Sequence, residues 1–143
     1  MTLAERIADV RARMVAAAQG RPVTLVAVTK THPPAVVRAA CAAGLSVFGE
    51  NYVQEWAAKR EALAELGIAW HFIGHLQKNK AKDVAGRVAL IHGVDSLGLA
   101  QALDRRAAAP QDVLVEVNVG GEVSPATVSL APPFDPASAR MQG

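Results

Sequence analysis

The sequence predicts an α/β fold in which parallel strands alternate with helices, as in part of a (β/α)8 barrel of the TIM type. Three observations support this prediction. Short apolar runs alternate with longer segments of helical periodicity. The apolar runs begin at residues 23, 45, 68, 88 and 113, at intervals of 22, 23, 20 and 25 residues. The 143 residues fit one domain, and at that spacing they hold about five of the eight strands of a closed barrel.

The N-terminal segment is predicted to be an amphipathic helix over residues 3–18. Thr2 and Glu5 form a capping-box pattern at its start, and Gly20 supplies its end. Apolar side chains recur at helical spacing at Leu3, Ile7, Val10 and Met14.

The first strand is predicted over residues 23–29, a β-branched run with so little polarity that both faces of the strand should be buried. Proline and glycine residues then divide the chain into strand–helix units. The remaining strands are predicted over 45–49, 68–74, 88–92 and 113–119, and the helices over 33–44, 51–67, 77–86 and 96–108.

The amino-acid composition changes after Ser124. Four of the eight prolines fall within residues 125–136, a density that neither a regular helix nor a central strand tolerates. We therefore expect a partial barrel over residues 1–124 and an irregular or disordered tail over residues 125–143.

Charge and composition narrow the class of protein. The 15 Lys and Arg against 13 Asp and Glu give a net charge of +2, too balanced for a surface that binds nucleic acid. Cys41 is the sole cysteine and cannot form an internal disulfide, and no apolar run is long enough for a signal peptide or a membrane span. We expect a cytoplasmic protein with neither a membrane nor a nucleic-acid partner.

Several side chains are predicted to be structural. His71 and His75 would lie roughly 13 Å apart on a strand, too far to share a metal ion. His92 is expected to be a hydrogen-bonded residue at the end of the sheet. The Lys78–Lys82 cluster has the charge to attract phosphate, but a solvated helix face is the expected role. Core positions are expected for Cys41, Trp56 and Trp70.

Lys30 is the residue most suited to covalent chemistry. It ends the first strand, and β/α barrels build their sites at the carboxyl ends of strands. Partial desolvation there would lower the pKa of the amine and let it attack a carbonyl group. The alternative is a rim lysine whose amine reaches solvent. Surface lysines that would give only nonspecific imines are expected at Lys59, Lys78, Lys80 and Lys82.

Three segments carry a distinctive order and spacing. They are Val-Ala-Val-Thr-Lys-Thr-His-Pro at 26–33, Phe-Gly-Glu-Asn-Tyr-Val-Gln-Glu at 48–55 and Trp-His-Phe-Ile-Gly-His-Leu-Gln-Lys-Asn-Lys at 70–80. These segments resemble the N-terminal signatures of the pyridoxal phosphate homeostasis protein family. A weaker likeness continues at 94–96 and 115–119, so the resemblance covers about residues 1–124.

The resemblance implies a barrel of the alanine-racemase type that binds pyridoxal 5′-phosphate (PLP). It implies that Lys30 forms a Schiff base with this cofactor. It also makes Asn51, His71 and Asn118 candidate pocket residues, although each of the three suits a structural hydrogen bond equally. The family is regarded as a carrier or regulator of PLP, so PLP homeostasis without catalysis is the expected function.

The sequence departs from the family pattern after the fifth strand. The resemblance leads us to expect a Lys/Gly segment, three more strands and a Ser/Gly-rich loop for the cofactor phosphate, and none of these follows residue 124. We therefore expect a truncated or frame-shifted family member that self-associates through open sheet edges or stays loosely folded. Two alternatives are a non-functional fragment or interaction remnant, and a racemase-like or decarboxylase-like PLP enzyme, which needs a positioned acid or base.

Overall fold

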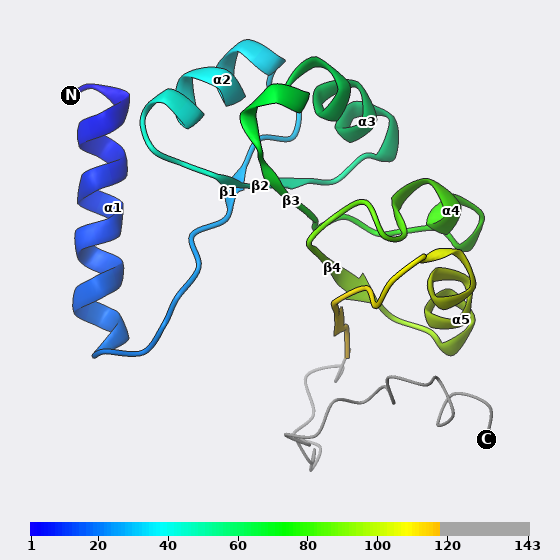
Figure 1. Ribbon diagram of the computed structural model, residues 1–143. Coiled ribbons are helices and arrows are strands. Elements are labelled where there is room, and N and C mark those ends of the chain that lie inside the picture. The colour runs from blue at the N-terminus through cyan, green and yellow to red at the C-terminus, as the bar shows by residue number, and fades with distance from the viewer. Residues whose placement is uncertain (118–143) are drawn as a thin grey trace.

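Five parallel strands form one sheet in the order of the sequence, β1-β2-β3-β4-β5 (Figure 1). The computed structural model describes residues 1–117, so the expected boundary at residue 124 and the tail over 125–143 lie outside the described part. Each pair of neighbouring strands is parallel and is joined through helical segments, which confirms the predicted α/β fold of a partial barrel. The strands are β1 Ala27–Val28, β2 Val47–Glu50, β3 Ala69–Phe72, β4 Leu90–Val94 and β5 Val113–Val115.

The first strand is much shorter than the predicted span 23–29. Pairing with β2 begins only at Ala27, opposite Phe48. The expected burial on both faces is wrong, because Val23 is 58% exposed and Val28 is 51% exposed. Within residues 1–117, β1 is an edge strand, and it lacks the second neighbour that a central parallel strand has.

The N-terminal helix is confirmed as α1, Leu3–Ala18. Its capping box is complete: the Glu5 amide donates to Thr2 Oγ1 at 3.2 Å, and the Thr2 amide donates to Glu5 Oε2 at 2.6 Å. This helix stands apart from the others (Figure 1). Arg11 Nη2 ties it to the turn before β2 by donating to the Gly44 carbonyl at 2.6 Å.

The helices between the strands are also shorter than predicted. They are α2 Pro34–Ala42, α3 Val53–Ala62, α4 Ala81–Val84 and α5 Leu97–Arg106. The predicted helix over 51–67 breaks at Leu63 and continues as a 3-10 turn, and the predicted helix over 77–86 begins with a 3-10 turn at Lys78–Lys80. No helix within residues 1–117 is long and apolar enough to cross a bilayer.

The hydrophobic core lies between the sheet and helices α2 to α5. Phe48 of β2 and Trp70 of β3 are register partners, and their ring centroids lie 6.1 Å apart. Trp56 of α3 is buried beside them, which confirms the core positions predicted for both tryptophans, and Cys41 packs against the same core while partly exposed. These contacts fix the helices on one face of the sheet.

The opposite face of the sheet carries a different set of side chains. Because successive residues of a strand point to opposite faces, His71 points away from the core that holds its neighbours Trp70 and Phe72. Gly49 and Val28 are in register with His71 and share this face. We call it the open face, and it is the side on which the strands meet no core helix of residues 1–117.

Gly74 follows β3 and lies against the backbone of Asn51. A Cβ atom built at Gly74 would be 2.2 Å from the Asn51 carbonyl oxygen, a distance that forces the backbone to move. The close approach of the β2–α3 connection to the end of β3 therefore requires glycine at this position.

We expect Gly74→Ala to destabilise the chain by about 1–3 kcal/mol, because the added methyl group overpacks a backbone contact. The matched control is Gly98→Ala in α5, where the new Cβ atom would meet only the flexible Lys78 side chain at 3.6 Å. Urea unfolding measures both variants. A midpoint that falls no further for Gly74→Ala than for Gly98→Ala would contradict the close approach.

Candidate functional site

Polar side chains follow four neighbouring strands at the carboxyl edge of the sheet. Lys30 follows β1, Asn51 follows β2, His75 follows β3 and Asp95 follows β4. Ligands of open α/β sheets bind at this edge, outside the carboxyl ends of the strands. The carboxyl edge and the adjoining open face therefore form the candidate site.

Lys30 lies at the carboxyl edge, as predicted, but its surroundings differ from the expectation. Thr29 before it is buried, whereas Lys30 is exposed. The expected partial desolvation is wrong for the described residues, because β1 is an edge strand there and one of its sides is uncovered. The alternative of a rim lysine that reaches solvent describes its environment.

Lys59 of α3 is a titratable residue whose position differs from the expectation. It was expected at the surface, yet only 2% of it is exposed. Its Nζ atom donates to the Thr29 carbonyl at 2.7 Å, to Glu50 Oε1 at 2.6 Å and to Glu55 Oε1 at 2.7 Å. Glu50 is fully buried and accepts a further bond from Thr29 Oγ1 at 2.7 Å. An ammonium group in the interior is thus matched by two carboxylates and a carbonyl oxygen.

Glu55 extends this group of contacts to the loop after Lys30. Its Oε1 atom accepts from the Thr31 amide at 2.6 Å as well as from Lys59. The hydrogen bond from Lys59 is the main cause that lowers the pKa of Glu55 below its ordinary value, opposed by partial burial. The Glu55 carboxylate therefore stays charged through the neutral pH range.

The burial of Lys59 could have been predicted from its spacing to apolar residues on the same side of the helix. Trp56 and Lys59 of α3 and Leu63, which caps its C-terminal end, are spaced by three and four residues, so they share one side of the helix, and all three are buried. Glu50 also indicated that Lys59 is buried. It ends an apolar run that was predicted to form a strand, and a buried carboxylate there needs a cation beside it.

His71 and His92 form a pair on the open face. Nδ1 of His71 lies 3.0 Å from Nε2 of His92, and the ring centroids are 5.2 Å apart. This contact confirms the prediction that His92 is hydrogen-bonded, although His92 lies in the middle of β4 and not at the end of the sheet. It gives His71 the structural hydrogen bond that was one of its two predicted roles. Burial, and secondly the charge of His92, lower the pKa of His71 below its ordinary value.

His75 does not join this pair. It is exposed, and its Nδ1 lies 3.6 Å from Asp95 Oδ2 across the β3 and β4 ends of the edge. Among residues 1–117, no three His, Cys, Asp or Glu side chains gather in a way that would hold a metal ion.

Asn51 is half-buried and has an unsatisfied group. Its Oδ1 atom is buried without a hydrogen-bond partner among the described residues. An orphaned acceptor at the carboxyl edge is suited to a donor from a ligand. Asn118, the fourth predicted site residue, lies outside the described residues.

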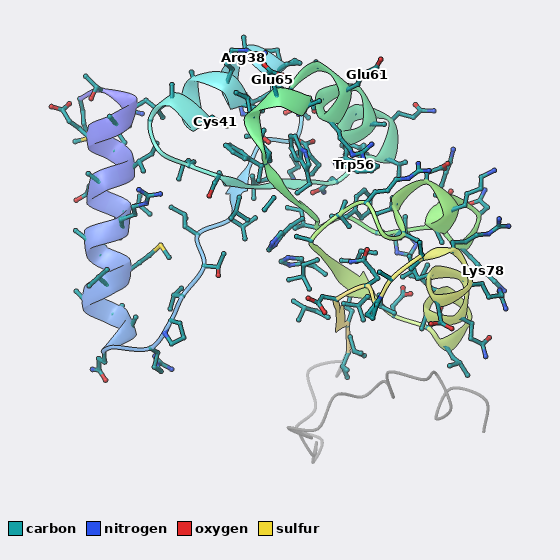
Figure 2. The ribbon with its side chains drawn as sticks, viewed as in Figure 1. Arg38, Cys41, Trp56, Glu61, Glu65 and Lys78 are labelled. Carbon is teal, nitrogen blue, oxygen red and sulfur yellow. The ribbon has the colours of Figure 1, made fainter. Side chains whose placement is uncertain are left out.

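The Lys78–Lys82 cluster begins in the 3-10 turn after β3, and its Lys80 lines a pocket together with Asn51 and His75. Lys78 and Lys82 are exposed, and Figure 2 shows Lys78 at the outer side of the helices. Lys78 and Lys82 have the solvated position that was expected for the cluster, whereas Lys80 is partly buried.

These features define the class of protein: an open parallel β/α domain of the barrel type, with its accessible polar groups at the carboxyl edge. Residues 2–126 match the family described as alanine racemase, N-terminal domain, and the chain belongs to this family. The resemblance found in the sequence is thereby confirmed.

Known relatives make the likeness more specific. The pyridoxal phosphate homeostasis protein of Pseudomonas aeruginosa is 50% identical over 131 residues, which cover 86% of this chain and 57% of the relative. The protein of the same name from Aquifex aeolicus is 52% identical over 101 residues, covering 68% and 44%. The structure of PipY from Synechococcus elongatus PCC7942 with PLP bound matches with a TM-score of 0.72 and 40% identity, covering 82% of this chain and 55% of PipY. The chain thus spans about half the length of these relatives.

We expect His71 to titrate below 6.5, the ordinary value, because protonation places a charge in a buried site beside His92. A depressed pKa in the folded state stabilises the fold above pH 6.5, and this contribution is lost as the pH falls from 6.5 through the folded value. NMR of the imidazole Cε1 protons measures the titration. His92→Phe should raise the pKa of His71, while His75→Phe serves as the control and should leave it unchanged. A His71 pKa at or above the ordinary value would contradict the assignment.

Proposed function

We propose that this chain binds pyridoxal 5′-phosphate and that the Lys30 amine forms a Schiff base with its aldehyde. The observation that carries the proposal is the exposed amine of Lys30 at the carboxyl edge, directly after the first strand. An amine that reaches solvent can meet an aldehyde without first losing a protein partner. PipY, to which this chain is similar, has been solved with PLP bound.

The neighbouring residues suit the same ligand. The unsatisfied Oδ1 of Asn51 can accept a hydrogen bond, and the imidazoles of His71 and His92 provide ring surfaces and nitrogen atoms on the open face. We propose Asn51 and His71 as pocket residues on this basis, and Asn118 on the resemblance alone. The resemblance assigns the phosphate to a loop after later strands, so Lys30 is the anchor that this chain itself contributes.

The proposed role is in PLP homeostasis, without catalysis by the chain itself. The relatives from Pseudomonas aeruginosa and Aquifex aeolicus carry the homeostasis name. A cytoplasmic location fits that role and the single cysteine, Cys41.

Trapping with borohydride tests the Schiff base. Reduction after addition of PLP should fix one cofactor mass on the peptide that contains Lys30, and Lys30→Ala should abolish this adduct. Lys82→Ala is the matched control, because Lys82 is an exposed lysine of α4 and not a residue at the carboxyl end of a strand. Its removal should leave the adduct intact. Peptide mass spectrometry locates the label. An adduct spread evenly over Lys78, Lys80 and Lys82 would show nonspecific imines and overturn the proposal.

We also propose that the chain self-associates through its sheet edges. Among the described strands, β1 and β5 each have one neighbour. Both carry exposed apolar side chains: Val28 is 51% exposed, Leu114 48% and Val115 58%. Exposed edges of this composition favour pairing with another copy of the chain.

Sedimentation velocity over a range of concentrations tests this association. Val28→Lys and Val115→Lys should shift the chain toward monomer, since a lysine at an edge opposes strand pairing. Val15→Lys is the control, because Val15 is 74% exposed on α1 and lies outside the sheet. A chain that is monomeric at every concentration, or that responds equally to Val15→Lys, would contradict association through the edges.

A further inference from the structure

The residues on both sides of Lys30 are held by one group of side chains. We call it the Lys59 cluster: Thr29, Glu50, Glu55 and Lys59. Thr29 before Lys30 is bonded through its hydroxyl to Glu50 and through its carbonyl to Lys59. Thr31 after Lys30 donates its amide to Glu55. The backbone of Lys30 is therefore fixed at two points, whereas its side chain is exposed.

Lys59 itself has no donor left for another partner. An ammonium group has three N–H donors, and those of Lys59 meet the Thr29 carbonyl, Glu50 and Glu55 at 2.6–2.7 Å. Because the amine is also buried, it is not available to an aldehyde. The two lysines near the first strand thus differ: Lys59 is held inside the fold, and Lys30 is exposed at the carboxyl end of β1 within residues 1–117.

The loop after Lys30 has a conformation that its own residues do not favour. Thr31 has a φ of 66°, in the left-handed region, which is unfavourable for a β-branched residue. Such a conformation persists where surrounding contacts impose it, and such positions concentrate at functional sites. Two contacts hold the turn here: the Thr31 amide donates to Glu55 at 2.6 Å, and the His32 amide donates to the Thr29 carbonyl at 3.0 Å.

We propose that Lys59 and Glu55 are positioning residues that hold the β1–α2 loop so that the Lys30 amine is presented at the carboxyl edge. This inference rests on the proposed PLP binding and adds the residues that prepare the reacting lysine for it. With the backbone fixed on both sides, only the rotations of the Lys30 side chain remain to be ordered when an aldehyde binds. Preorganisation of this kind speeds bond formation by lowering its entropic cost.

A purely structural role for the same contacts is the competing explanation. In that case the Lys59 cluster would only join α3 to β1 and β2, and its loss would lower stability without a specific effect at Lys30. Lys59→Met does not separate the two explanations, because it leaves the Glu50 carboxylate buried without its cation and is expected to unfold the chain. Glu55 allows the distinction, because its side chain is 26% exposed and it alone reaches Thr31.

The experiment compares Glu55→Ala with Glu55→Gln in the full chain. Glu55→Ala removes the acceptor of the Thr31 amide, whereas Glu55→Gln keeps a side-chain oxygen at that place. Glu61→Ala is the matched control, a glutamate on the outer side of the same helix (Figure 2). Two quantities are measured: hydrogen exchange at the Thr31 amide without any cofactor, and the rate of PLP adduct formation at Lys30 relative to Lys82 in the same sample.

Glu55→Ala should speed exchange at Thr31 by about tenfold or more and slow the adduct at Lys30 by about tenfold relative to Lys82. Glu55→Gln should restore part of both quantities, and Glu61→Ala should change neither. Faster exchange at Thr31 with an unchanged adduct rate would overturn the positioning role while leaving PLP binding intact. If the unaltered chain forms no adduct at Lys30, the proposed function itself fails, and the exchange data then show whether the cluster holds the loop.

Discussion

The carboxyl edge of the sheet depends on the contact between the Lys59 ammonium and the Glu50 carboxylate. This ion pair lies inside the fold and joins α3 to the ends of β1 and β2. Both groups are removed from water, so each needs the other, and loss of one partner of such a pair costs about 3–5 kcal/mol. The pair cannot slide as a hydrophobic contact can, because its hydrogen bonds require particular atoms. It therefore fixes where the first strand ends and where the next helix lies.

The sheet separates this buried network from the open face. The side of Phe48, Glu50 and Phe72 carries the core and the ion pair, while the side of Gly49 and His71 carries the imidazole pair. This division follows from the alternation of side-chain directions along each strand. The core and the ion pair thus lie on one face of these strands and the imidazole pair lies on the other, so a substitution on one face affects the other through the backbone.

The sequence allowed prediction of the order and parallel arrangement of the strands, since the spacing of apolar runs and the intervening helices permit few other topologies. It did not allow prediction of the length of the first strand, because burial of residues 23–26 depends on a neighbour and not on their own composition. Lys30 was found because it follows its strand directly. Lys59 was missed because a Glu and a Lys four residues apart on a helix usually form a surface pair, and its buried partner Glu50 comes from another element. The contact between His71 and His92 likewise depends on the register of β3 with β4, which the sequence does not specify.

The hydrogen bond between His71 and His92 limits how many protons the two imidazole rings can bind. Two neutral imidazoles have four ring nitrogens and two protons, so one ring donates and the other accepts across the 3.0 Å contact. A third proton leaves this bond intact, because one nitrogen between the rings still has a lone pair. A fourth proton removes the last acceptor and sets two cations against each other at the junction of β3 and β4. The hydrogen bond between the rings can therefore persist with one added positive charge, and a second added charge must separate the two rings.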